Sequence, residues 1–154
     1  PHKAQQDVTP ASLRLEMVYA AVAADARFEV SEYETMRAGR SYTVDTLNAL
    51  RREFPEATMY FIVGGDEYEA LGGWREPEQV LDIARLAVVD RDGTQAAHAI
   101  PDVVGAEAVD FVPVEQIDIS SSQVRVHVAA GRDAVDLVPP AVAAIIERER
   151  LYRD

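Results

Sequence analysis

Residues 119–125 read ISSSQVR, a run of hydroxyl side chains followed by an arginine three positions after the last serine. Serine hydroxyls, a guanidinium and the free N–H groups at a helix start can all donate hydrogen bonds to phosphate oxygens. On a helix, Arg125 shares one face with Ser121 and Ser122, which precede it by four and three positions. The stretch therefore predicts a phosphate-binding cluster or, on a plainer interpretation, a serine N-cap followed by a solvated arginine.

A second candidate is the stretch VGGDEY, in which two glycines close an apolar run. Gly64 and Gly65 would let the backbone approach a ligand closely, and the Asp66 carboxylate could accept hydrogen bonds from a ribose. The alternative is a tight turn with Asp66 as the N-cap of the following helix. The sequence by itself favours this alternative, because short glycine motifs often occur without a ligand.

Two more stretches have residue types that suit a ligand. Tyr42 and Thr43, in SYTVDT, are placed at a helix start whose N–H groups could hold a carboxylate or a phosphate; ordinary capping by Ser41 or Thr43 is the alternative. Trp74 is the only tryptophan and precedes another expected helix, within GGWREP. Stacking on an aromatic ligand and packing against the core are equally good interpretations of this side chain.

The elements that must position these residues alternate between helix and strand. Apolar runs predict strands within 58–66, at 86–89 and within 108–119, and an alternating pattern predicts a half-buried or edge strand at 28–33. Helices are expected within 9–25, with Thr9 as N-cap, and within 39–55, 76–85, 120–131 and 139–152. A turn is expected at Asp92 and Gly93. This order predicts an α/β fold with a parallel, Rossmann-like sheet and helices on both faces, in one domain over residues 1–154.

Composition excludes several classes of protein. The chain has 48% hydrophobic residues but no apolar run long enough for a membrane span, so we expect no membrane partner. The formal charge of −12 argues against binding nucleic acid, which needs cations to neutralise phosphates. The absence of cysteine fits a cytoplasmic protein. His2, His98 and His127 are scattered, so we expect no metal site built from protein ligands.

The four motifs SYTVDTL, FIVGGD, GGWREP and ISSSQVR, in this order, resemble those of bacterial nicotinate-nucleotide adenylyltransferases. The resemblance covers essentially the whole chain. It implies binding of ATP and nicotinate mononucleotide above a Rossmann-like sheet, with Mg²⁺ accompanying ATP, and formation of deamido-NAD and pyrophosphate. It leaves open a homo-oligomer. A phosphopantetheine adenylyltransferase and a non-catalytic nucleotide-binding domain are the alternatives.

The resemblance also implies roles for single residues. Tyr42 and Thr43 would hold the nicotinate carboxylate, Trp74 would stack on the pyridine ring, and Arg75 would belong to the same substrate site. Lys3 matches a lysine near the substrate phosphate. The nucleotide would lie against the glycine turn and the serine motif, and the expected ATP-binding residues are Gly64, Gly65, Asp66, Ile119, Ser120, Ser121, Ser122 and Arg125. The last three of these are also the expected catalytic residues.

One feature of the family is missing from the printed sequence. The resemblance implies an N-terminal strand and a loop of the form GGxFDPxHxGH, whose two histidines would contact the ATP phosphates. Neither is present in the 154 residues, and His2 does not supply such a pair. Because the first strand of such folds is central in the sheet, we expect that an N-terminal segment precedes this sequence in the enzyme.

Overall fold

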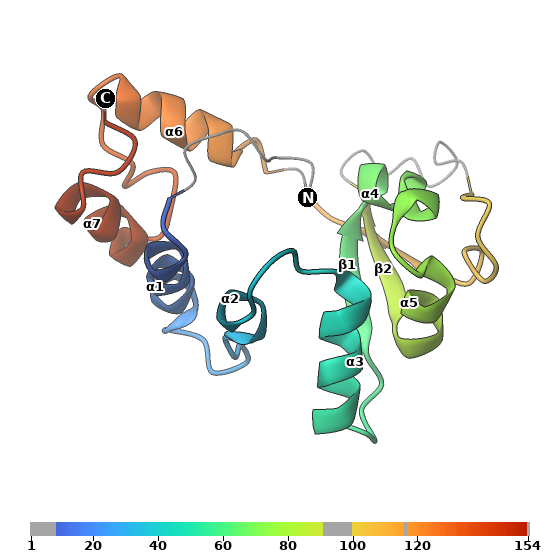
Figure 1. The fold of residues 1–154 in the computed structure, drawn as a ribbon. Helices are drawn as coiled ribbons and strands as arrows, with labels where there is room; N and C mark the ends of the chain where they lie inside the picture. Colours follow the sequence, from blue (N-terminus) through green and yellow to red (C-terminus); the bar gives the residue numbers. More distant parts are fainter. Residues whose placement is uncertain (1–8, 91–99, 116, 154) are drawn as a thin grey trace. The chain divides into compact units, whose positions relative to one another are not determined.

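A computed structural model describes residues 9–90, 100–115 and 117–153 of the chain. These residues form two compact units (Figure 1). The sheet unit consists of the described residues between 39 and 115, and the helical unit consists of residues 9–38 and 117–153. The single domain expected from the sequence stays a prediction.

The sheet unit contains three parallel strands in the order β1-β2-β3. They are β1 (Tyr60–Gly64), β2 (Arg85–Asp90) and β3 (Asp110–Pro113), with Ile62 opposite Ala87 and Val88 opposite Phe111. The chain passes from β1 to β2 through α4 (Gly65–Glu69), the 3-10 helix η1 (Leu71–Gly73) and α5 (Pro77–Ile83). The parallel α/β class and the three predicted strand regions are thereby confirmed, although β3 is shorter than the apolar pattern indicated.

One face of this sheet forms the main core. Val63, Leu86 and Val88 are buried there together with apolar side chains of α3 (Thr43–Glu53) and α5, which lie side by side. Full burial of side chains of this size stabilises the fold by about 1.5–3 kcal/mol each. Alternate strand positions point the other way, and Tyr60 and Ile62 are exposed there. Burial therefore alternates along β1 although its residues are apolar throughout, and the face that carries Val63 meets the helices.

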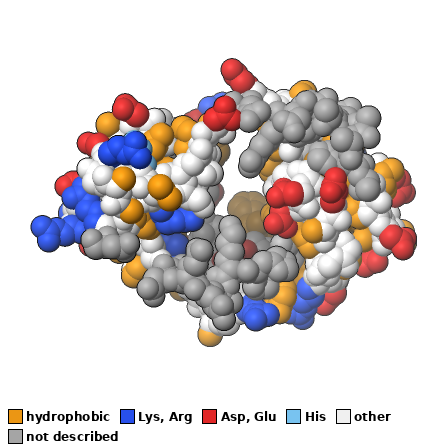
Figure 2. Space-filling view, turned by 90° about the horizontal axis from the view of Figure 1, so that it is seen from above, with side chains coloured by type: hydrophobic (Ala, Val, Ile, Leu, Met, Phe, Trp, Pro, Cys, Tyr) orange, Lys and Arg blue, Asp and Glu red, His pale blue; other side chains and the backbone are white. Residues whose placement is uncertain are grey.

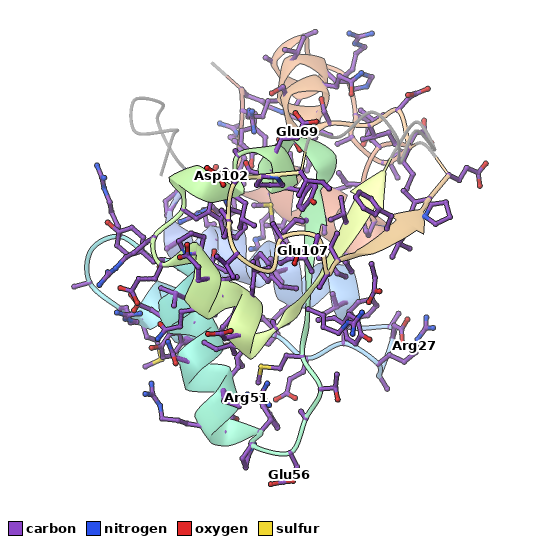
Figure 3. The ribbon with its side chains drawn as sticks, turned by 90° about the vertical axis from the view of Figure 1, so that its right-hand side faces the viewer. Arg27, Arg51, Glu56, Glu69, Asp102 and Glu107 are labelled. Carbon is purple, nitrogen blue, oxygen red and sulfur yellow. The ribbon has the colours of Figure 1, made fainter. Side chains whose placement is uncertain are left out.

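Arg51 and Tyr68 tie loops of the sheet unit to its helices. The Arg51 guanidinium donates to the carbonyl oxygens of Pro55, Ala57 and Ile83, at 3.3, 2.7 and 2.6 Å. Figure 3 shows Arg51 near the end of α3, beside the turn that carries Glu56. The hydroxyl of buried Tyr68 donates to the carbonyl oxygen of Ala106 at 2.9 Å and so fastens the segment before β3 to α4.

The helical unit has a separate core. The described residues of this unit form α1 (Ala11–Val22), α2 (Tyr33–Met36), α6 (Ser121–Ala129) and α7 (Pro140–Arg148). Val124 and Val128 of α6 pack with Val142 and Ile146 of α7. The predicted helices at 120–131 and 139–152 are thus confirmed, and Gly131, at φ +75°, follows α6 in the left-handed conformation that favours glycine. No helix in the described part of the chain is long and apolar enough to cross a bilayer.

Two local predictions for the helical unit are wrong. Residues 28–33 form no strand: Phe28 is 61% exposed, and the short helix α2 begins at Tyr33. The N–H groups of Thr35 and Met36 both donate to the carbonyl oxygen of Glu32, which makes a helical turn where alternation suggested an edge strand. The N-cap of α1 is Pro10 rather than Thr9, whose hydroxyl instead bonds the Tyr152 hydroxyl at 3.3 Å.

Candidate functional site

The glycine turn at the carboxyl end of β1 leads directly into α4. Gly64 is the N-cap and Gly65 the first helical residue, so the expectation that Asp66 caps this helix is wrong. The exposed Asp66 side chain folds back over the turn, where a Cβ added to Gly64 would lie only 2.6 Å from Oδ1 of Asp66. Glycine at position 64 therefore leaves room for the carboxylate at the mouth of the turn.

The start of α3 has no side-chain cap. Tyr42 is the N-cap residue, in an extended conformation and without a capping hydrogen bond, so the alternative of capping by Ser41 or Thr43 is wrong. In the part of the chain that the structure describes, the N–H groups of Thr43 and Val44 have no hydrogen-bond acceptor. Helix starts of this kind attract anions, because these donors and the positive end of the helix dipole coincide.

The loop after η1 brings Trp74 and Arg75 to the same unit. Trp74 is half-buried, and its ring meets the Phe61 ring edge-on, with the centroids 6.0 Å apart. Packing of the indole against the core is thus confirmed, and stacking of its exposed part on a ligand stays a prediction. The Arg75 guanidinium lies over the Tyr42 ring, 4.8 Å from its centroid, and so connects this loop to the start of α3.

The start of α6 carries its own cap. Ser120 is the N-cap: its hydroxyl accepts from the N–H of Gln123 at 3.2 Å, and the Gln123 side chain accepts from the N–H of Ser120 at 2.6 Å. This reciprocal pair is a capping box, so the plainer interpretation of ISSSQVR is confirmed for Ser120. It satisfies two backbone donors and leaves the hydroxyls of Ser121 and Ser122 outside the cap.

Ser122 and Arg125 form a polar pair one helical turn further on. The Arg125 guanidinium donates to the Ser122 hydroxyl at 3.0 Å, as their spacing of three residues predicted. Arg125 is half-buried and Ser122 is exposed, so the pair is ordered and still accessible. A guanidinium held in this way can bind phosphate oxygens with little further loss of side-chain freedom.

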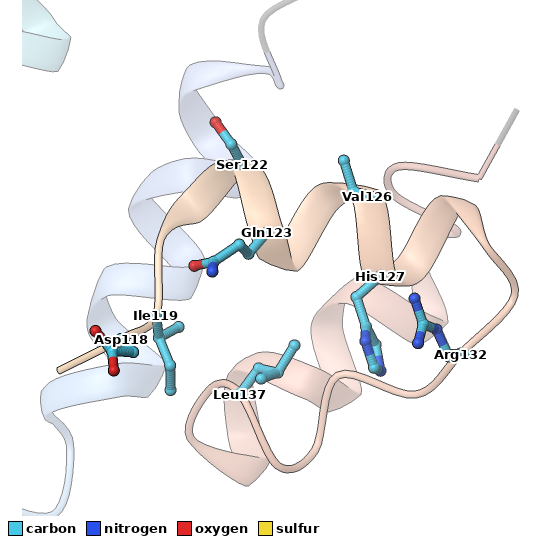
Figure 4. Close-up of a pocket in the computed structure, with 8 residues that line it drawn as sticks. All are labelled: Asp118, Ile119, Ser122, Gln123, Val126, His127, Arg132 and Leu137. Carbon is cyan, nitrogen blue, oxygen red and sulfur yellow. The ribbon is translucent and has the colours of Figure 1, made fainter.

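A pocket of about 420 Å³ adjoins this motif within the helical unit (Figure 4). Its size is typical of small-molecule sites. Ser122 and Ile119, both predicted site residues, line it. His127 and Arg132 line it as well, and neither was predicted to be a site residue. The pocket-lining residues of α6 form two pairs spaced four apart, Ser122 with Val126 and Gln123 with His127. This spacing puts them on one face of the helix, and it is the signal from which the sequence could have predicted the pocket-lining face. The complete lining is Asp118, Ile119, Ser122, Gln123, Val126, His127, Arg132 and Leu137.

The two units differ in charge. The described residues of the sheet unit include 14 acidic side chains and 5 arginines, whereas those of the helical unit include 10 acidic side chains and 8 arginines. Figure 2 shows acidic side chains gathered over the right-hand part of the view, where α4 and α5 lie in Figure 1. An anionic substrate therefore meets an opposing field at the sheet unit, unless local cations offset that field.

Some predictions fall on residues that the structure does not describe. Lys3 and the turn at Asp92 and Gly93 lie outside the described residues, as do His2 and His98. Among residues 9–90, 100–115 and 117–153, no group of three or more histidine or acidic side chains could hold a metal ion. The predicted residues that are described fall into two sets, one around β1 and α3 in the sheet unit and one at the start of α6 in the helical unit.

Comparison with known proteins identifies the family that this chain matches. A family model described as cytidylyltransferase-like matches residues 1–127. A probable nicotinate-nucleotide adenylyltransferase of Pelobacter propionicus is 36% identical over 173 aligned positions, which cover all of this chain and 80% of the relative. The Thermus thermophilus protein of the same name is 42% identical over 153 positions, which cover 99% of this chain and 78% of the relative.

Solved structures agree on the fold. The nicotinic acid mononucleotide adenylyltransferase of Plasmodium falciparum, complexed with APC, superposes with a TM-score of 0.70 at 18% identity. The superposition covers 96% of this chain and 78% of that protein. The same enzyme complexed with NaAD gives a TM-score of 0.69. The Rossmann-like α/β fold predicted from the sequence is therefore confirmed.

Proposed function

The chain belongs to the nicotinate-nucleotide adenylyltransferases, and from this premise we propose that it transfers the adenylyl group of ATP to nicotinate mononucleotide in NAD biosynthesis. A phosphate oxygen of the mononucleotide attacks the α-phosphorus of ATP. The bond from that phosphorus to the oxygen bridging the β-phosphorus breaks, so that deamido-NAD forms and pyrophosphate leaves. No covalent bond to the protein is needed, because binding energy and charge stabilisation suffice for a transfer of this kind.

The ATP phosphates are assigned to the start of α6. The observation that carries this assignment is the Ser122–Arg125 pair, 3.0 Å apart and accessible, beside a self-capped helix start. In this proposal Arg125 and the hydroxyls of Ser121 and Ser122 offset the charge on the phosphate oxygens as pyrophosphate leaves. Ser120 is assigned mainly to the cap, where its hydroxyl accepts the N–H of Gln123 and its own N–H donates to the Gln123 side chain. The neighbouring Ile119 lines the adjoining pocket.

Nicotinate mononucleotide is assigned to the sheet unit. The uncapped start of α3, at Tyr42 and Thr43, offers N–H donors to the nicotinate carboxylate, and the exposed part of Trp74 offers a surface for the pyridine ring. The glycine turn leaves room for Asp66 to accept hydrogen bonds from a nucleotide ribose. Tyr42 and Trp74 pack against the core that α3, β1 and α5 share, which supports their assignment to this site.

Mg²⁺ is proposed to arrive bound to the phosphates of ATP. The described residues provide no cluster of side chains that would hold it, so we assign it no protein ligand and no step of the reaction. We further propose that the enzyme acts in the cytoplasm, which the cysteine-free composition fits.

The test is an assay of pyrophosphate release with ATP and Mg²⁺, performed on this chain and on the full product of its gene. Each is offered nicotinate mononucleotide, nicotinamide mononucleotide or phosphopantetheine, and the nucleotide product is identified by mass. Release with nicotinate mononucleotide, accompanied by deamido-NAD, is expected. A preference for phosphopantetheine would select the other adenylyltransferase. Release with none of the three by either protein would leave a non-catalytic nucleotide-binding domain.

A further inference from the structure

Arg75 lies across the first turn of α3. Its guanidinium contacts the ring of Tyr42, the N-cap residue, and one of its terminal nitrogens is 3.8 Å from a carboxylate oxygen of Asp45, the third helical residue. The residues between these two are Thr43 and Val44, whose N–H groups have no acceptor in the described structure. A cation is thus held next to the donors that a carboxylate would use.

Two carboxylates lie near this helix start, and Arg75 is placed to offset part of their charge. Asp45 lies in the first turn, and the carboxylate of Glu76 lies 3.4 Å from Nε of Arg75. Both carboxylates would oppose an incoming anion, and the unit as a whole is acidic. Arg75 is within ion-pair distance of both, so its single positive charge offsets part of the negative charge that these two carboxylates place beside the helix start.

The other arginines described in the sheet unit are less well placed for this purpose. Arg51 donates to three carbonyl oxygens at the far end of α3, and Arg85 pairs with Asp110 at 3.0 Å. Arg52 belongs to the last turn of α3, a helix length away from the start. Arg40 precedes the helix, and within the described residues it makes no ion pair with Asp45 and no cation–π contact with Tyr42.

From this geometry we propose that the side chain of Arg75 makes the site select a pyridine carboxylate over the corresponding carboxamide. The inference rests on the proposed function, since it concerns the substrate site assigned there. The two ligands have nearly the same shape, but the carboxylate carries one more negative charge and accepts hydrogen bonds at both oxygens. The amide offers one acceptor and an NH₂ group, which cannot bond to a backbone N–H donor.

Trp74 provides a direct way to measure this selectivity. It is the only tryptophan of the sequence and adjoins Arg75, so its fluorescence reports ligand binding at this place without any turnover. Titrations with nicotinate mononucleotide and nicotinamide mononucleotide give a ratio of dissociation constants for each protein. The variants are Arg75→Gln, which removes the charge, and Arg75→Lys, which keeps it. Arg52→Gln is the matched control, because it removes an equal charge from the other end of α3.

In Arg75→Gln, binding of nicotinate mononucleotide should weaken about tenfold while binding of nicotinamide mononucleotide changes less than about twofold. Arg75→Lys should keep most of the selectivity, and Arg52→Gln should keep all of it. The selectivity of the parent should also decline at high salt, whereas that of Arg75→Gln should not.

An equal loss for both mononucleotides in Arg75→Gln would overturn the proposal, because Arg75 would then only hold the loop after η1 in place. Unchanged affinity for both mononucleotides would overturn it as well, and so would the absence of any fluorescence response to either ligand. Selective binding without pyrophosphate release would contradict the proposed function and leave the role of Arg75 standing. The two conclusions can therefore fail separately.

Discussion

The starts of α3 and α6 both have sequences typical of an anion-binding helix, and they are built differently. At α6, Ser120 and Gln123 close a capping box, and the anion-binding groups are the side chains of Ser122 and Arg125. At α3, the N-cap is Tyr42 and no side chain caps the helix. In the described residues the N–H groups of the first two helical residues have no acceptor at either helix start, so the difference between the two lies in their side chains. The first arrangement suits a ligand with many charged oxygens, and the second suits a single carboxylate.

The charge around each helix start follows the same division. In the described residues of the helical unit, acidic side chains and arginines are nearly equal in number. A phosphate that approaches Arg125 therefore meets only a weak opposing field. The sheet unit has 14 acidic side chains against 5 arginines, so binding of an anion there depends on how the nearest cation is placed. This comparison gives each helix start its own expected response to mutation.

The largest effect is expected for Arg125→Ala. Removing the guanidinium leaves the phosphate charge of the departing pyrophosphate less stabilised, so kcat should fall by about 100-fold or more. The melting temperature should hardly change, because Arg125 is only half-buried and donates a hydrogen bond to the exposed Ser122. Steady-state kinetics together with thermal unfolding check this. Loss of the fold instead of the rate would make Arg125 a structural residue.

Trp74→Ala should weaken nicotinate mononucleotide by about tenfold or more, because stacking of an aromatic ring contributes roughly 1–3 kcal/mol. ATP should be affected much less. Trp74→Phe, which retains a ring against Phe61, is the control for lost core packing. The two KM values measure the difference. Equal weakening of both substrates would assign Trp74 to the core alone.

Gly64→Ala should reduce affinity for the nucleotide whose ribose lies at the glycine turn, by several-fold, since about 1 kcal/mol is typical of one displaced hydrogen bond. The new Cβ would lie 2.6 Å from Oδ1 of Asp66 and must push this carboxylate away. Gly73→Ala is a matched control, because a Cβ there meets nothing within 4 Å. Binding measured by calorimetry for both substrates tests this prediction, and identical behaviour of the two variants would refute it.

Ser120→Ala should lower stability without lowering the rate of the chemical step. The loss of the capping box costs about 0.5–2 kcal/mol. Denaturant unfolding measures the change, and kcat should stay within about threefold of the parent, because one neutral hydrogen bond contributes near 1 kcal/mol at most. A fall in kcat as large as that of Arg125→Ala would place the Ser120 hydroxyl on the phosphates instead of in the cap.

The smallest effect is expected for Tyr68→Phe, which loses one buried hydrogen bond to Ala106 and about 1 kcal/mol of stability. Burial, and to a lesser extent the charge of Glu107, raise the pKa of Tyr68 above its ordinary value. A raised pKa in the folded state gives stability that is present below the unfolded pKa and is lost as the pH rises through the folded one. The parent should therefore lose more stability than Tyr68→Phe in alkaline solution, as unfolding curves would reveal. Parallel curves would contradict this.

The sequence predicted the elements whose patterns are local and strong. The apolar run of β1 and the helix that carries Val44 and Leu47 are confirmed, because burial of these side chains agrees with the local periodicity. The strand expected at 28–33 is wrong. Alternation describes a strand only where a neighbouring strand completes the hydrogen bonds, and Glu32 instead accepts bonds from the start of α2.

Capping was predicted less well, for a physical reason. The residue at the N-cap depends on where tertiary packing makes the helix begin, and at α3 the burial of Val44 and Leu47 coincides with a start at Thr43, so that Tyr42 and not Ser41 occupies the cap. The contact between Arg75 and Tyr42 joins residues far apart in the chain and leaves no periodic signal. The motif resemblance identified both as site residues, but only the folded chain relates one to the other.

The most direct test of this division is calorimetric binding of ATP and of nicotinate mononucleotide to the parent, Arg125→Ala and Trp74→Ala. A crossed pattern is predicted: Arg125→Ala loses affinity for ATP and keeps nicotinate mononucleotide, and Trp74→Ala does the reverse. If each variant loses both ligands equally, the helical unit and the sheet unit do not serve different substrates, and the proposed division is contradicted.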